Sequence, residues 1–300
     1  MPVKLKLPSA APVRTTLYVA CAAALHLELD FSPMARCVVC GMAGASRKPQ
    51  KKEHQKVMQL SLTQSEVSIN ETAHKTRGYD ECRREFVRIF NDTARYHHRF
   101  QVFRDFVEMA AIAVQNAFIR SSELEERYLS IVKNYETTDA HKMAALLGCL
   151  VQALTDRPGD FLGQIFMDLE ISSSAMGQVF TPYEVSRLMA QISAGNVTQR
   201  LEHEPYITLH EPAVGAGSMV IAFAEAMADQ RVNYQKKLFA SCVDIDPVAV
   251  HMCYLQLSLL GVPAEVTIGN TLTLQFGRTF RTPLWYIDNW AGRLSAANTK

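Results

Sequence analysis

The sequence predicts an α/β protein in which a helical domain precedes a partial open sheet. Apolar residues recur at steps of three and four from about residue 80 to 155, as they do in packed helices. From residue 206 onward, short apolar runs typical of buried strands alternate with helical segments, separated by turns rich in glycine and aspartate. We therefore expect a poorly structured leader and linker over 1–57, a helical N-terminal domain over 58–160 and an α/β domain over 161–300.

Composition limits the class of protein. The 300 residues are 48% hydrophobic and 20% charged, enough to bury one substantial core with a smaller domain attached. No apolar run reaches the roughly 18 residues that a membrane helix needs, so we expect no membrane partner. Among seven cysteines, only Cys37 and Cys40 form a C-x-x-C pair, which predicts no metal site and a reduced, cytoplasmic protein.

Charge is unevenly distributed along the chain. The net charge is +1, yet residues 47–100 carry 12 Lys and Arg against 7 Asp and Glu. Such a segment can face a polyanion such as DNA, or it can be the solvated face of helices. His97 and His98 lie in it without carboxylate or cysteine neighbours at ligand spacing, so we expect packed or surface histidines.

The helical domain is predicted from one apolar stripe. Its spacing predicts one long helix or two abutting helices over 80–118, with further helices over 124–135 and 141–154 before Pro158 and Gly159.

A second motif, Gly177-Gln178-Val179-Phe180-Thr181-Pro182, has the features of a helix start. Thr181 is suited to the N-cap, Pro182 to the first helical position, and Glu184 to the third position of a capping box. The face expected to be buried consists of Val185, Leu188, Met189 and Ile192. A capped helix alone would not need the preceding Gly-Gln-x-Phe.

Three strands and two helices are predicted after residue 205. The strands cover 206–210, 238–243 and 264–268, with helices over 218–229 and from Pro247 to just before Gly261, the latter capped by Asp246. The alternation is that of parallel nucleotide-binding sheets. The turns that follow the strands should therefore meet at one edge of the sheet.

These turns carry residue types suited to a nucleotide-like cofactor. The glycines of Glu211-Pro-Ala-Val-Gly-Ala-Gly217 let backbone N–H groups approach a ligand at a helix N-terminus. Asp244 is placed to bind ribose hydroxyls, as in both NAD and S-adenosylmethionine sites. The missing third glycine and the acidic-Pro pair favour S-adenosylmethionine, whose sulfonium does not conflict with a carboxylate as a pyrophosphate does. An NAD enzyme remains the distant alternative.

Four motifs resemble those of N6-adenine DNA methyltransferases of the type I restriction-modification methylation-subunit family. In chain order they are Gly177–Pro182, Glu211–Gly217, Asp244-Ile-Asp-Pro247 and Gly269-Asn-Thr-Leu272. The resemblance implies a partial Rossmann-like, S-adenosylmethionine-dependent methyltransferase sheet, with DNA and specificity or restriction subunits as partners. It also implies site roles: Phe180 and Thr181 at the methionine end, Glu211, Gly215 and Gly217 in the turn beneath, Asp244 at the ribose, and Asn270, where the family usually has aspartate, at the adenine.

The catalytic turn of that family is an Asn/Asp-Pro-Pro-aromatic tetrapeptide, which this sequence lacks. Its nearest candidate is Thr282-Pro283-Leu284-Trp285, at the expected end of a fourth strand, with Thr282, Pro283 and Trp285 as the candidate catalytic residues. The length after Trp285 predicts four strands in all and no target-recognition domain. Two functions remain open: a DNA adenine-N6 methyltransferase of restriction-modification type, or a catalytically inactive cofactor-binding relative with a regulatory or assembly role.

Overall fold

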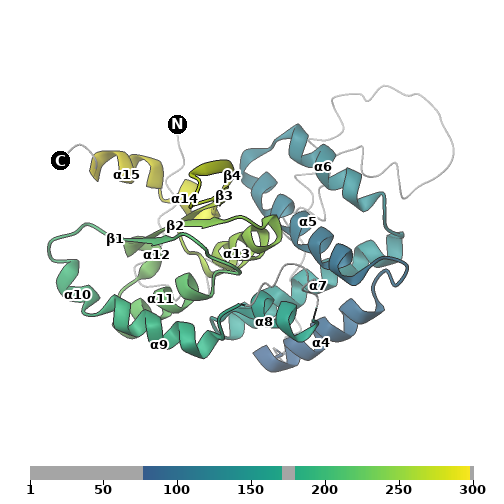
Figure 1. Cartoon of the computed structure of the whole chain (residues 1–300), viewed down its shortest axis with the longest axis horizontal. Helices are drawn as coiled ribbons and strands as arrows, with labels where there is room; N and C mark the ends of the chain where they lie inside the picture. Colours follow the sequence, from purple (N-terminus) through teal and green to yellow (C-terminus); the bar gives the residue numbers. More distant parts are fainter. Residues whose placement is uncertain (1–76, 171–179, 298–300) are drawn as a thin grey trace, which may run out of the picture. The chain divides into compact units, whose positions relative to one another are not determined.

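The computed structural model describes residues 77–170 and 180–297, which all belong to one compact unit (Figure 1). The leader predicted over 1–57, the Cys37–Cys40 pair and residues 177–179 lie outside the described residues. The helices before the sheet are α4 (Tyr79–Asp92), α5 (Arg99–Ile119), α6 (Ser122–Val132), α7 (Thr137–Asp156), α8 (Phe161–Asp168), α9 (Tyr183–Ala194) and α10 (Val197–Arg200). The remaining elements are β1 (Ile207–Glu211), α11 (Ser218–Asp229), α12 (Tyr234–Lys237), β2 (Leu238–Asp244), α13 (Pro247–Leu260), β3 (Ala264–Asn270), β4 (Gln275–Arg281), α14 (Pro283–Ile287) and α15 (Trp290–Ala297).

The apolar stripe over 80–118 forms two helices, α4 and α5, which was one of the two predicted possibilities. The chain leaves α4 where Thr93 turns its hydroxyl back to the Ile89 carbonyl, and Ala94 takes a φ of 42°. The Arg99 guanidinium donates to the carbonyls of Phe90 and Ala94, which closes the corner between the helices. The break is thus held by side-chain hydrogen bonds to backbone carbonyls that have no partner within a helix.

The sheet has the order β1-β2-β3-β4. Strands β1, β2 and β3 are parallel, with Ile207 opposite Leu238 and Ala240 opposite Ala264, which confirms the predicted alternation. Strand β4 ends where a fourth strand was expected, at Arg281, but it pairs antiparallel to β3. The molecule is therefore a partial Rossmann-like α/β fold whose last strand runs back to the opposite edge.

Helices cover both faces of the sheet. Helices α11 and α13 pack on one face, where Ala240 and Cys242 of β2 point. On the other face Phe239 stacks on Trp290 of α15, with ring centroids 5.6 Å apart. Both faces of β2 are therefore buried, which explains its nearly continuous apolar sequence.

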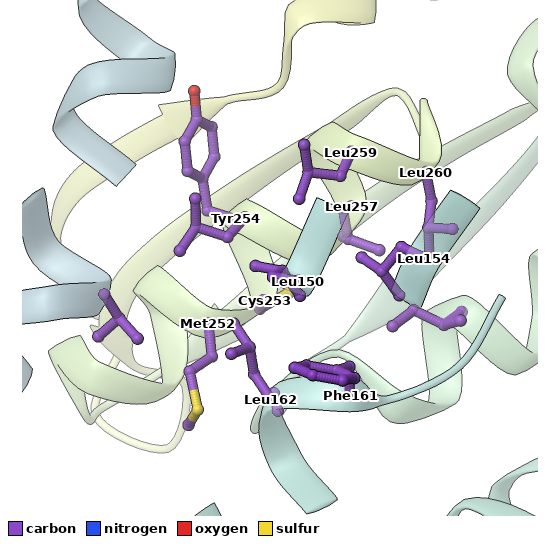
Figure 2. Close-up of a cluster of buried hydrophobic side chains, with 14 of the residues drawn as sticks. Leu150, Leu154, Phe161, Leu162, Met252, Cys253, Tyr254, Leu257, Leu259 and Leu260 are labelled. Carbon is purple, nitrogen blue, oxygen red and sulfur yellow. The ribbon is translucent and has the colours of Figure 1, made fainter. Parts of the chain in front are cut away.

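Helix α13 is apolar all round because it is packed on every side. Besides the sheet, it contacts α5, α7 and α8. Figure 2 shows Leu150 and Leu154 of α7 and Phe161 of α8 beside Leu257 of α13. The core is thus continuous across residue 160. The division into a helical domain and an α/β domain at that residue stays a prediction.

Helix α9 differs from the prediction in both its start and its buried face. It begins at Tyr183 with Pro182 at the N-cap position, so Thr181 does not cap it. The expected buried face is exposed: Val185 is 45%, Leu188 60%, Met189 48% and Ile192 74% accessible. The buried side chains are instead mostly small (Ser186, Ala190, Ala194), together with Tyr183. The reason is the close approach of α11, where the Ser218 hydroxyl donates to that of Ser186 at 2.7 Å.

Candidate cofactor site

The glycine loop joins β1 to α11 in a conformation that only glycine adopts without strain. Gly215 has a φ of 55° and Gly217, the residue before α11, a φ of 98°. A Cβ on Gly215 would lie 3.0 Å from the Phe180 ring, and one on Gly217 would lie 3.2 Å from the Cys253 sulfur. The two glycines therefore allow a close approach of backbone, aromatic ring and helix at this edge of the sheet.

Asp244 at the end of β2 holds the glycine loop in place. Its Oδ2 accepts from the Gly215 N–H at 2.8 Å, and its Oδ1 accepts from the Asp246 N–H at 2.9 Å. Asp246 in turn caps α13 by accepting from the Val248 N–H, as predicted. Because an ionised carboxylate has about four acceptor positions, Asp244 retains capacity for further hydrogen bonds.

A pocket of about 270 Å³ opens between α9 and the glycine loop. Four of the predicted cofactor residues line it: Phe180, Thr181, Glu211 and Gly215. The other three, Gly217, Asp244 and Asn270, do not line it, although Asp244 contacts the loop that does. The volume lies just below the roughly 300–1,000 Å³ of pockets that enclose a drug-sized ligand. It therefore suits one end of an extended cofactor better than the whole molecule.

Phe180 and Glu211 occupy different environments in this pocket. The Phe180 ring packs on Phe166 of α8, with centroids 5.4 Å apart, so the helical part of the chain supports it. Burial raises the pKa of Glu211, and the Ala213 N–H partly opposes that shift. The pocket thus combines an apolar wall with a partly buried carboxyl.

Three polar side chains of this pocket were not predicted from the sequence: Asp160, Ser186 and Ser218. Asp160 precedes α8 and caps it by accepting from the Gly163 N–H at 2.9 Å. The Pro158-Gly159-Asp160 sequence before an apolar helix was a usable cap signal. The proximity of Asp160 to the glycine loop could not be predicted, because it depends on packing between segments that are distant in the sequence.

Gln256 of α13 connects Asp160 to the glycine loop. Its Nε2 donates to Asp160 Oδ1 at 2.9 Å and to the Ala216 carbonyl at 2.8 Å, and its Oε1 accepts from the Leu162 N–H at 2.9 Å. Gln256 is fully buried, so these three bonds satisfy a side chain that would otherwise cost free energy. The start of α8 and the glycine loop are thereby held together.

Asn270 closes the turn after β3. Its side-chain oxygen accepts from the N–H groups of Leu272 and Thr273, at 3.0 and 3.1 Å. The Thr271 hydroxyl donates to the Pro212 carbonyl at 2.9 Å, which brings this turn beside the glycine loop. The structure thus brings the turns after β1, β2 and β3 to one edge, as the sequence predicted.

The three candidate catalytic residues lie elsewhere. Because β4 is antiparallel to β3, Thr282 lies at the beginning of β3, the edge opposite the pocket. Its hydroxyl accepts from the Ala264 N–H and donates to the Val262 carbonyl, and Pro283 is buried beside it. Trp285 lies under the Arg281 guanidinium, 4.6 Å from its ring centre. The structure thus does not bring Thr282, Pro283 or Trp285 to the cofactor edge, although they stand at the end of the fourth strand as expected.

The basic segment and its histidines form structural contacts in the part described. Arg83 pairs with Asp168, and Arg88 with Glu85. His98 caps α5 by accepting from the Phe100 N–H, and a His97 ring nitrogen lies 2.9 Å from the Asn134 carbonyl. Residues 77–170 and 180–297 hold no group of three His, Cys, Asp or Glu side chains that could bind a metal.

Together, the glycine loop, Asp244 and the pocket at the carboxyl edge of parallel strands define a Rossmann-like cofactor-binding protein. Residues 156–282 match the N-6 DNA methylase family. The match confirms the resemblance drawn from the motifs. No curated protein matches the chain.

Two solved structures are similar to the chain at low sequence identity. One, from Listeria monocytogenes, is assigned to the class I S-adenosylmethionine-dependent methyltransferases; it is 11% identical, covers 62% of this chain and 53% of its own, and has a TM-score of 0.34. The other is the methyltransferase subunit of a type I restriction-modification system from Streptococcus thermophilus, at 13% identity, with coverage of 63% and 57% and a TM-score of 0.31. The chain spans just over half the length of each.

The family implies S-adenosylmethionine as the cofactor, and the residues present fit it. Phe180 packs directly against the Gly215 backbone to form the apolar wall of the pocket, and the pocket offers hydroxyls and carboxyls to an amino-acid end. Among the described residues, no helix is long and apolar enough to cross a membrane.

Proposed function

We propose that the chain is an S-adenosylmethionine-dependent, DNA adenine-N6 methyltransferase-like protein of restriction-modification type. The observation that carries this proposal is the meeting of Phe180, Gly215 and Asp244 at one sheet edge within a segment of the N-6 DNA methylase family. When bound, the cofactor supplies a methyl group on a sulfonium, which the amine of an adenine base can accept.

In this proposal the chain's own residues orient the cofactor. Phe180 and Thr181 hold the methionine end in the pocket, and Gly215 and Gly217 allow the ligand to lie against the loop. Asp244 keeps the loop in shape through its bond to the Gly215 N–H and accepts from the ribose with its remaining lone pairs. Asn270 lies further along the same edge, towards the adenine.

DNA and specificity or restriction subunits are the partners we propose, by analogy with the family. A cytoplasmic location is consistent with the free, buried thiols of Cys82, Cys149, Cys242 and Cys253. One observation favours the second candidate function, a catalytically inactive relative that binds the cofactor and acts in regulation or assembly. It is the position of Thr282 to Trp285 at the edge opposite the pocket, which leaves the described residues without a candidate catalytic turn beside the cofactor.

Calorimetry of the full chain with S-adenosylmethionine, followed by transfer of a labelled methyl group to DNA, tests both candidates. We expect binding that Asp244→Ala weakens and that Asp229→Ala, at the exposed end of α11, leaves unchanged. Transfer to adenine, alone or with a specificity subunit, supports the enzyme. Binding without any transfer supports the inactive relative, and no binding by the unmodified chain overturns both.

A further inference from the structure

One carboxylate of the pocket is used by none of the contacts proposed above. Asp160 lines the pocket together with Glu211 and Thr181, yet the residue is only 2% exposed. It comes from the helical part of the chain, 51 positions before Glu211. A buried carboxylate in a ligand pocket is costly unless hydrogen bonds or a cation stabilise it.

The hydrogen bonds to Asp160 reach only one of its oxygens. Oδ1 accepts from the Gly163 N–H and from Gln256 Nε2, both at 2.9 Å. No hydrogen bond from the described residues reaches Oδ2. Position 163 is occupied by glycine, and a Cβ there would collide with Oδ2. One oxygen therefore fixes the direction of the carboxylate, and the other, which lies against Gly163, accepts no hydrogen bond from the described residues.

Asp160 also lacks a counter-charge. Over residues 77–170 and 180–297, no lysine, arginine or histidine forms an ion pair with it. Burial raises the pKa of Asp160, and the only opposing influences are the neutral donors Gln256 and Gly163. A cationic group that entered the pocket would provide the partner that the protein itself does not supply.

The rest of the pocket suits a group that carries both charges. Ser218 lies at the first turn of α11, where backbone N–H groups without helical partners favour a carboxylate. The Thr181 hydroxyl can donate to the same carboxylate, whereas the Ser218 hydroxyl donates to Ser186. A carboxylate acceptor on one side and N–H and O–H donors on the other match the zwitterion of an amino acid.

We propose that Asp160 binds the α-ammonium group of the amino-acid end of S-adenosylmethionine, with Gln256 as its positioning residue. This assignment rests on the proposed function and adds to it a binding residue from outside the glycine, Asp244 and Asn270 motifs. It also links cofactor binding to the helical part of the chain, because Asp160 is the N-cap of α8.

The test compares ligands that carry the amino-acid end with one that lacks it. Calorimetry of the full chain would measure S-adenosylmethionine, S-adenosylhomocysteine and methylthioadenosine against wild type and Asp160→Asn. We expect the variant to bind the first two about 10- to 100-fold more weakly, since a hydrogen bond to a charged group is lost, and to bind methylthioadenosine unchanged. Equal weakening of all three ligands, or of none, overturns the role of Asp160 while the proposed function stands.

A matched control separates the pocket from a general effect of charge. Asp139→Asn also neutralises a buried carboxyl near the start of a helix, but that carboxyl, in the first turn of α7, pairs with Lys142. It should change none of the three affinities. If the unmodified chain binds none of the ligands, the proposed function and the role of Asp160 both fail.

The unmodified protein provides a second measurement in case Asp160→Asn does not fold. S-adenosylhomocysteine and its analogue without the α-amino group should differ in affinity by about the same 10- to 100-fold. If the variant folds, the loss from removing both groups should be smaller than the product of the two single losses. If the combined loss of affinity equals the product of the two single losses, the Asp160 carboxylate and the α-amino group do not interact.

Discussion

Gly215 has a left-handed backbone conformation and also lines the pocket. Its φ of 55° and the Phe180 ring 3.0 Å from a Cβ position leave no room for a side chain. We expect Gly215→Ala to lower the free energy of unfolding by about 1–2 kcal/mol, the usual cost of a left-handed conformation, and to weaken cofactor binding. Urea unfolding and calorimetry measure the two effects.

Gly148→Ala is the matched control. Gly148 lies inside α7, and apart from its chain neighbours and the backbone of its own helix nothing lies within 4 Å of its Cβ position. Helix propensity alone should make this variant more stable by about 0.5–1 kcal/mol. A loss of stability in both variants would show that strain in the glycine loop is not the cause.

His251 predicts a pH dependence of stability. Burial lowers its pKa from 6.5 to about 4. The charge of Glu108 partly opposes this shift, and that of Arg278 adds to it. Below pH 6.5 the unfolded chain takes up a proton at this histidine that the folded chain does not, so the contribution of His251 to stability falls as the pH falls to about 4 and does not change further below that. The difference is about 3 kcal/mol at 1.36 kcal/mol per pH unit.

His251→Leu should remove this dependence, and it also removes an Nδ1 atom that has no hydrogen-bond partner. Urea unfolding at pH 7, 5.5 and 4 measures the slope. His141→Leu, on the exposed side of α7, should keep the slope of the wild type. An unchanged slope in the His251 variant would mean that another group is responsible.

At this scale the sequence predicted local roles well and distant ones poorly. Asp246 as cap and Gly261 as helix end depend only on neighbours along the chain, and both were found. Asp160 could be predicted as a cap but not as a pocket residue, because it reaches the loop through Gln256, 96 positions away. Asp244 was expected to bind ribose, and its two bonds to backbone N–H groups could not be deduced from its place after a strand.

The face that α9 buries can be tested at the level of the element. Ile192→Ser should change the free energy of unfolding by less than about 0.5 kcal/mol, as expected of an exposed position, because Ile192 is 74% exposed. Ala190→Leu should cost about 1–3 kcal/mol, since it overpacks a fully buried contact. Urea unfolding of the two variants measures both values. A larger loss of stability in Ile192→Ser than in Ala190→Leu would show that α9 buries the face predicted from the sequence.

Two elements show why the sequence prediction failed where it did. In α9, hydrophobicity indicated the apolar stripe as the buried face, whereas the close approach of α11 selects the small side chains Ser186 and Ala190. In β4, the end of the strand was predicted but its direction was not. Only residues 271–274 separate β3 from β4, which suits a hairpin, while a parallel connection needs about a dozen residues or more. That spacing was a signal in the sequence.

For the whole molecule, the continuous core predicts one cooperative transition. Leu150 of α7 is fully buried against the side chains of α13 (Figure 2). We expect Leu150→Ala to cost about 2–5 kcal/mol, as other buried leucines do, and to shift the whole unfolding curve. Far-UV circular dichroism follows all helices, and fluorescence follows Trp285 and Trp290, which lie near the sheet.

Coincidence of the two signals is the decisive result. If the helices and the sheet share one core, both signals should move together in Leu150→Ala. A fluorescence transition that stays in place while the circular dichroism transition moves would show that α4–α8 unfold separately from the sheet.

Cys253 lies directly beneath Gly217, with its sulfur 3.2 Å from the Cβ position of that glycine. Its thiol is fully buried, so an alkylating reagent can reach it only when α13 and the loop move apart. The alkylation rate of this one side chain, followed by peptide mass spectrometry, therefore reports how often the glycine loop and α13 separate. A bound cofactor should slow that chemistry, which makes Cys253 a probe of occupancy that requires neither DNA nor catalysis.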